Sequence, residues 1–162
     1  MKGTSVMAGY RRYLSKKHLR GLYLEPYVKY LHHTGDGIGN TTLNGEAVSM
    51  HFTNDYKGIG LGAQLGAQFI ISKRIVIDLF FLGPEINSAK DNFKAVEITN
   101  AIPWNEVQAN EAQKDIKDFV DQFPFVGNKT TVTVDKSNRT VTAGFKGALP
   151  GVRAGVSFGI AL

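Results

Sequence analysis

The sequence contains no cysteine, and this absence excludes a disulfide framework and a thiolate metal site. It also lacks a long apolar run. The longest stretch without a charge covers residues 58–72 and is interrupted by glycine and glutamine, so no membrane-spanning helix is predicted. Residues 1–14 contain no apolar segment as long as that of a secretory signal peptide. These absences exclude a helical membrane protein but permit a membrane β-barrel, in which only alternate residues of each strand are apolar.

The dominant pattern in the sequence is the alternation of apolar residues with small or polar ones. From Ile59 to Ile71 every second residue is apolar, and the residues between are mostly glycine and glutamine. This period of two continues well past the usual globular strand of about 5–6 residues. The pattern recurs in residues 21–30, 74–81 and 152–162, and less regularly in residues 4–14. It predicts five strands, each about as long as the 9–11 residues that cross a membrane.

The two faces of these strands predict which side meets lipid. Leucine, isoleucine, valine and phenylalanine on one face suit hydrocarbon, whereas a narrow barrel interior holds small residues and a few charges. We predict that Ile59, Leu65, Phe69, Val156 and Phe158 face lipid, and that Gln64, Gln68, Arg153 and Ser157 face inward. A soluble lipocalin-like barrel, with the two faces reversed, is the alternative.

Five charges alternate with the apolar residues and form the predicted barrel interior. They are Glu25, Lys29, Arg74, Asp78 and Arg153. Because unpaired charges in a closed interior are costly, Arg74 and Arg153 are predicted to pair with Glu25 and Asp78. A second basic group, at Arg11, Arg12, Lys16, Lys17 and Arg20, is interpreted as a solvated turn, and no nucleic-acid motif accompanies it.

The connections between strands predict an orientation. Residues 15–20 and 71–74 are short links, typical of periplasmic turns, whereas residues 33–55 and 84–150 are long and are expected outside the cell. The prediction is one domain over residues 1–162, an all-β fold with one inserted helix, built as an antiparallel up-and-down transmembrane barrel. Five strands are fewer than the roughly eight of the smallest barrels, so we expect further N-terminal strands and a signal peptide to precede this chain.

The insertion at residues 84–150 has a helical and a strand pattern. Asn105 and Gln108 form a capping box before a helix at 106–123, and Pro124 follows its end. Threonine-rich strands predict a hairpin over residues 130–145. We expect the helix to pack on this hairpin as an external cap; the alternative is two more barrel strands. The residues assigned to this cap are Trp104, Ile116, Phe119, Val120 and Phe123. We expect the hairpin to cover the apolar stripe of the helix, so that a partner meets the outer side of the cap or residues 33–55.

Several strand signatures together resemble a small outer-membrane β-barrel family of unknown function from bacteroidete-type bacteria. They are residues 10–17, 21–30, 60–72 and the ending 150–162. The resemblance covers nearly the whole chain and implies a fold and an outer-membrane location, but no activity. Barrels of this kind usually end in an aromatic residue that the assembly machinery recognises, whereas this chain ends in Leu162. The resemblance therefore implies either recognition through Phe158 and the apolar alternation or weaker recognition.

Residues that could carry chemistry are scarce. Histidines at 18, 32, 33 and 51 lack the spacing of a metal site, and the glycine-rich residues 35–40 lack the lysine of a phosphate loop. We therefore predict a non-enzymatic outer-membrane protein with a structural or surface-interaction role, and no catalytic, cofactor or metal residues. Its expected partners are outer-membrane lipid, the assembly machinery and an unknown surface ligand or protein. A narrow pore and a lipid-modifying enzyme are the alternatives.

Overall fold

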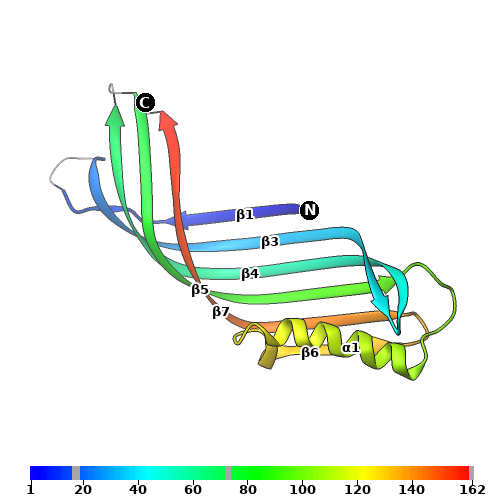
Figure 1. Cartoon of the computed structure of the whole chain (residues 1–162). Helices are drawn as coiled ribbons and strands as arrows, with labels where there is room; N and C mark the ends of the chain where they lie inside the picture. The colour runs from blue at the N-terminus through cyan, green and yellow to red at the C-terminus, as the bar shows by residue number, and fades with distance from the viewer. Residues whose placement is uncertain (16–18, 72–73, 161–162) are drawn as a thin grey trace. The chain divides into compact units, whose positions relative to one another are not determined.

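The computed structural model describes residues 1–15, 19–71 and 74–160, and it is built mainly of antiparallel strands with one helix (Figure 1). The elements are β1 (Lys2–Gly9), β2 (Arg12–Tyr13), β3 (Gly21–Leu43), β4 (Glu46–Ile71), β5 (Ile75–Glu97), α1 (Glu106–Asp121), the 3-10 turn η1 (Gly127–Lys129), β6 (Thr130–Asp135) and β7 (Thr140–Ile160). The all-β prediction with one inserted helix is confirmed.

The strands form one sheet in the order β1-β3-β4-β5-β7-β6, with the short β2 paired to β3. Among the described residues this sheet is open, with β1 and β6 as its edge strands. Closure into a barrel therefore stays a prediction. The described part of the chain also contains no helix that is long and apolar enough to cross a membrane.

Two compact units divide the chain. Unit 1 consists of Met1–Thr4, Leu31–Gly58 and Ser88–Leu149, and unit 2 of Ser5–Tyr30, Ile59–Asn87 and Pro150–Leu162. The long strands β3, β4, β5 and β7 contribute residues to both units, whereas α1 and β6 belong to unit 1 alone.

Unit 2 shows the alternation predicted from the sequence. On β4, Ile59, Leu61 and Phe69 are exposed, whereas Gln64 is only 2% exposed. The departures from the predicted faces are Leu65, which is half-buried, and Ser157, which is exposed. On β5 the alternation changes phase, because Phe81 and Leu82 are both exposed, as occurs at a β-bulge. Pro84, which has no N–H to donate to a neighbouring strand, follows this change directly.

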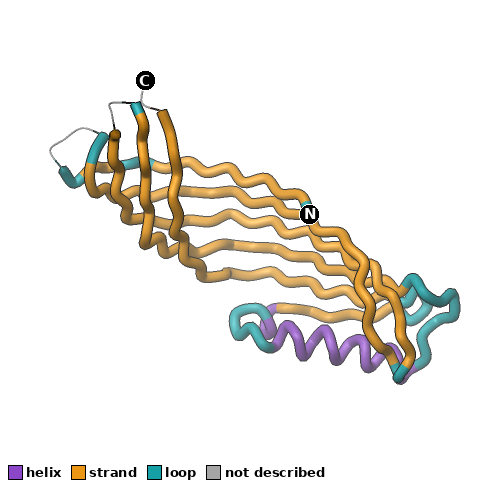
Figure 2. The backbone as a smooth tube through the Cα atoms, turned by 45° about the horizontal axis from the view of Figure 1, so that its top comes forward, coloured by secondary structure: helices purple, strands orange, loops and turns teal. Residues whose placement is uncertain are grey.

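Unit 1 packs α1 against strand residues (Figure 2). Asn105 caps the N-terminus of the helix: its side chain accepts a hydrogen bond from the Gln108 backbone at 2.9 Å, while the Gln108 side chain accepts one from the Asn105 backbone at 3.1 Å. The predicted capping box is therefore confirmed. The buried core consists of Leu43, Val48, Met50, Ala95, Trp104, Ala109, Ala112 and Val141.

Residues 33–55 are not a loop as predicted, because β3 and β4 continue through them and meet at Asn44 and Gly45. Both turn residues have positive φ, 52° and 80°, as a tight two-residue hairpin requires. The Asn-Gly pair is the sequence signal that could have located this hairpin.

The predicted insertion is also shorter than expected, because β5 extends to Glu97 and β7 begins at Thr140. The predicted hairpin is confirmed by the register from Thr130↔Phe145 to Asp135↔Thr140, but its second strand is the start of the long β7. The helix ends at Asp121 rather than Phe123, since Pro124 disfavours helical geometry at the residue before it.

Some predictions fall on positions 16–18, 72–73 and 161–162. These positions include half of the two short links, among them Lys16, Lys17 and His18, and the terminal Leu162. They lie outside the described residues.

Candidate functional site

The candidate site in unit 2 is the face of the sheet that carries polar residues, here called the polar face. On β3 it presents Tyr23, Glu25 and Tyr27, which are all buried, while Leu22, Leu24 and Val28 between them are exposed. Asp78 of β5 and Gln64 of β4 are buried on the same face. Buried polar residues beside exposed apolar ones reverse the usual order of a soluble protein.

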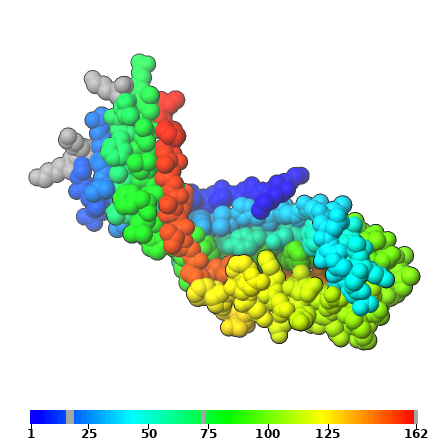
Figure 3. Space-filling view, in the orientation of Figure 1, coloured from blue at the N-terminus to red at the C-terminus, as the bar shows by residue number. Residues whose placement is uncertain are grey.

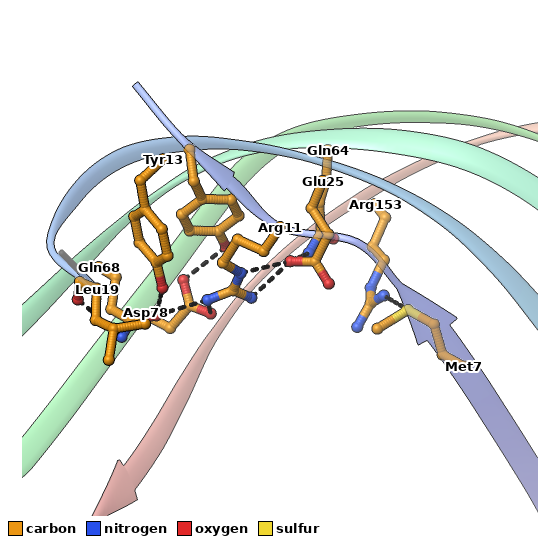
Figure 4. A network of polar contacts seen from close by, with 10 residues as sticks. Met7, Arg11, Tyr13, Leu19, Glu25, Gln64, Gln68, Asp78 and Arg153 are labelled. Atoms are coloured by element: carbon orange, nitrogen blue, oxygen red, sulfur yellow. Dashed lines mark hydrogen bonds and ion pairs between the residues drawn. The ribbon is translucent and has the colours of Figure 1, made fainter. Parts of the chain in front are cut away.

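Arg11 is the centre of this face (Figure 4). Its guanidinium pairs with Glu25 Oε2 at 2.6 Å and with Asp78 Oδ2 at 2.8 Å. It also donates to Gln68 Oε1 at 2.6 Å and lies 3.9 Å from the centre of the Tyr23 ring. The Arg11 guanidinium therefore pairs with two carboxylates at once. It also contacts the Gln68 amide and the Tyr23 ring.

The neighbouring polar groups complete the arrangement around Arg11. The Tyr23 hydroxyl donates to Asp78 Oδ1 at 2.6 Å, and the Gln64 amide donates to Glu25 at 3.2 Å. The Tyr13 hydroxyl shares Gln68 Oε1 with Arg11, at 2.8 Å. Both carboxylates thus accept from a charged and a neutral donor, which offsets the cost of burying them.

A second ion pair lies on the same face. Lys29 Nζ is 2.5 Å from Glu85 Oε1, and the Tyr27 hydroxyl donates to Glu85 Oε2 at 2.8 Å. The Asn87 amide donates to the same carboxylate at 3.1 Å. Lys29, one of the predicted interior charges, therefore pairs with Glu85. From the sequence, Glu85 was assigned to the insertion at residues 84–150 and not to the barrel interior.

Arg153 of β7 reaches across the polar face. Its guanidinium lies 4.7 Å from the centre of the Phe80 ring and 5.6 Å from that of Tyr27, and it contacts the sulfur of Met7 in β1. Neither β3 nor β1 is a neighbour of β7 in the sheet order. The sheet of unit 2 is therefore strongly curved, with its polar face on the concave side.

Glycines of β4 make room for the tyrosines of β3. A Cβ atom on Gly62 would lie 2.6 Å from the Tyr27 hydroxyl and 2.9 Å from the Pro84 carbonyl, and one on Gly66 would overlap Tyr23. This close approach explains why glycine alternates with apolar residues along β4.

Of the five predicted interior charges, four lie on the polar face, but the predicted pairing is wrong. Arg74 is exposed and has no ion pair with a described residue, and Arg153 contacts rings and sulfur rather than carboxylates. Arg11 takes the place predicted for them. The basic residues around Arg11 led to its interpretation as part of a solvated turn. Arg11 and Tyr13 are two residues apart and so lie on one face of a strand, and this spacing was the sequence feature that indicated an inward side chain.

The predicted cap residues of unit 1 have different environments. Trp104 is 4% exposed and its indole N–H donates to Glu97, and Ile116 packs against the same core. Phe119 is 60% exposed and Phe123 is also exposed, with their rings 5.6 Å apart. The prediction that the whole apolar stripe is covered is therefore wrong. Residues near 115–130, yellow in Figure 3, form an exposed surface of unit 1.

An apolar pocket of about 210 Å³ lies under the C-terminal half of α1. Ile116, Phe119, Val120 and Phe123 of the helix segment line it. Opposite them lie strand residues, among them Phe93, Ala143 and Phe145. Val126 and three polar residues, Asn54, Asp91 and Thr130, complete the lining.

Asp91 and Asn54 are two of the three polar residues of this pocket, and the Asn54 amide donates to Asp91 Oδ2 at 3.5 Å. The third, Thr130, donates its hydroxyl to the Val126 carbonyl at 2.8 Å. Oδ1 of each residue is buried and accepts no hydrogen bond from the described residues. Burial raises the pKa of Asp91 above its usual value, and the charge of Asp55 acts in the same direction.

Two of the described histidines, His32 and His51, each pair with an aspartate. His32 contacts Asp55 at 2.9 Å, and His51 contacts Asp36 at 2.8 Å. Asp55 also pairs with Lys57 at 3.0 Å, which together with His32 holds the pKa of Asp55 below its usual value. No group of three potential metal ligands is found within residues 1–15, 19–71 and 74–160.

No protein-family model, curated protein or solved structure matches this chain.

Proposed function

We propose that the chain is a non-enzymatic outer-membrane β-barrel protein, with unit 2 embedded in lipid and unit 1 outside the cell as the part that meets partners. The observation that carries this proposal is the reversed character of the sheet in unit 2. Apolar side chains such as Leu61, Val156 and Phe158 are exposed on one face, while charged and amide side chains are buried on the other. In water such an apolar face is costly, whereas in hydrocarbon it is the favourable outer surface.

The hydrogen bonding of the polar face supports a filled interior rather than a pore. Arg11 and Lys29 bind the carboxylates of Glu25, Asp78 and Glu85, and Gln64, Tyr23 and Tyr27 occupy space between them. A barrel with few strands has an interior that side chains fill. Closing the remaining sheet edges, with additional strands, completes the backbone hydrogen bonds that lipid requires.

The absence of cysteine makes a direct test possible. Leu61→Cys and Val156→Cys each introduce a single thiol on the exposed apolar face, where these residues are 61% and 56% exposed. Lys114→Cys, on the exposed side of α1, is the matched control. Each variant is labelled with an environment-sensitive fluorophore and reconstituted into phosphatidylcholine vesicles that contain spin-labelled acyl chains.

We expect the spin-labelled lipid to quench the label at positions 61 and 156 and not at position 114. Aqueous iodide should quench in the opposite order, because unit 1 is placed in water. Equal quenching of all three labels by iodide, with no effect of the lipid quencher, would overturn the membrane assignment.

The orientation is tested on intact cells that carry the protein. External protease should cut at exposed connections of unit 1, such as residues 98–105 and 122–129, because these lie outside the strands. Cleavage between residues 15 and 20 in intact cells would reverse the proposed orientation.

A further inference from the structure

We propose that the pocket beneath the C-terminal half of α1 binds a small amphipathic cation, namely an amine that carries one aromatic ring or a short alkyl chain. The pocket lies wholly in unit 1, so this inference goes beyond the membrane role of unit 2 and does not depend on it.

The size of the pocket sets the size of the ligand. Its volume is about 210 Å³. An engineered apolar cavity of roughly 150 Å³ in another protein takes up benzene, so this pocket accommodates a single ring with a short substituent. The rings of Phe93, Phe119, Phe123 and Phe145 supply apolar and aromatic walls. Such walls favour a flat or short apolar body.

The polar groups of the pocket set the chemistry of the ligand head. Oδ1 of Asp91 and Oδ1 of Asn54 are both hydrogen-bond acceptors, and neither receives a donor from the described residues. No lysine or arginine is among the described residues that line the pocket, so the charge of Asp91 has no cationic partner there. An ammonium group offers three donors and a positive charge, which complements two acceptors of which one is anionic. A carboxylate ligand would place acceptor against acceptor.

The aromatic walls favour the same ligand charge. A cation beside the faces of aromatic rings is attracted by their quadrupole, and this attraction is larger where water is excluded. The exposed Phe119 and Phe123 border the pocket, so the ligand would enter past the end of α1 and cover apolar surface that is otherwise in contact with solvent.

The test is calorimetric titration of the full chain in a nonionic detergent with three probes that share one ring: benzylamine, benzyl alcohol and benzoate. Benzylamine is expected to bind with a Kd of about 1 mM, a realistic affinity for so small a molecule. Benzyl alcohol should bind at least about tenfold more weakly, and benzoate should show no binding above the detergent background.

Two variants locate the binding. Asp91→Asn should weaken benzylamine at least tenfold, whereas Asp118→Asn, which removes the same charge from the exposed side of α1, should leave its Kd unchanged. Ala143→Met adds volume to the pocket wall and should also abolish binding. The fluorescence of the buried Trp104 verifies that each variant keeps the fold of unit 1.

Equal binding of benzylamine and benzyl alcohol, or a benzylamine Kd that is the same in wild type and Asp91→Asn, would overturn the assignment of a cation site. Absence of benzylamine binding at 10 times the expected Kd, about 10 mM, would overturn the site altogether. The titration reads unit 1 alone, so its failure is distinguishable from a failure of lipid quenching at positions 61 and 156.

Discussion

Replacing Arg11 by glutamine should be among the most destabilising single changes in unit 2. The change leaves Glu25 and Asp78 without the cation that both contact, at 2.6 and 2.8 Å. Removing one partner of a buried ion pair costs about 3–5 kcal/mol because the other charge stays buried. The Arg11 side chain is 26% exposed, so solvent screens part of this cost and the lower end applies. We therefore expect a loss of about 3 kcal/mol, a folding constant roughly a hundredfold smaller.

The assay is urea unfolding of the full chain in detergent, followed by circular dichroism of the β-sheet. Arg12→Gln is the matched control, because it removes the same charge one residue away on an exposed side chain. It should change the free energy of unfolding by less than about 0.5 kcal/mol.

A compensating variant separates charge balance from shape. Glu25→Gln and Asp78→Asn, added to Arg11→Gln, remove both carboxylate charges, so much of the lost stability should return. If Arg11→Gln and Arg12→Gln were equally stable, or if the triple variant were no more stable than Arg11→Gln, the argument that Arg11 balances two buried carboxylates would be refuted.

Three further changes test other parts of the structure. Gly62→Ala should destabilise by about 1–3 kcal/mol, because its Cβ would crowd a backbone carbonyl, whereas Gly144→Ala has open space and should be neutral within about 0.5 kcal/mol in the same urea assay. Because the pKa of Asp91 is raised, the folded chain binds this proton more tightly than the unfolded chain. The free energy of unfolding of wild type, relative to that of Asp91→Asn, should therefore rise as pH falls from neutral through the folded pKa. A difference between the two that does not change with pH would contradict this. Asn105→Ala should cost about 1 kcal/mol through loss of the helix cap, while Asn110→Ala on the exposed side of the helix should not, as read by fluorescence of the single tryptophan during unfolding.

The sequence correctly predicted those features of the fold that depend on residues close together in the chain. The alternation from Ile59 to Ile71 indicated a strand with Gln64 on the buried side, and Asn105 with Gln108 indicated the start of α1. These predictions succeeded because the period of a strand and the hydrogen bonds of a helix cap involve residues that are close in the chain.

Features that depend on distant residues were not predicted. Residues 33–43 lack an apolar alternation and contain glycine at 35, 37 and 39, so the strand there is set by its pairing partners rather than by its own pattern. The partners of Arg11 lie 14 and 67 positions away, in β3 and β5. The alternation of Arg11 with Tyr13 indicates an inward side chain, but it does not identify these two carboxylates as its partners. The apolar pocket arises from helix and strand residues that only the folded unit 1 brings together.

The contacts of Arg11 also impose an order on folding. Its carboxylate and amide partners lie in β3, β4 and β5, so the set is incomplete until the chain has been made as far as Asp78. Closing loops of that length before any compensating contact forms is entropically slow. In a nascent or truncated chain that ends before β5, Arg11 has Glu25 as a partner but lacks Asp78. Early formation of the polar face would therefore add little stability. The same residue that stabilises the finished sheet therefore favours a late, concerted assembly over stepwise addition of strands.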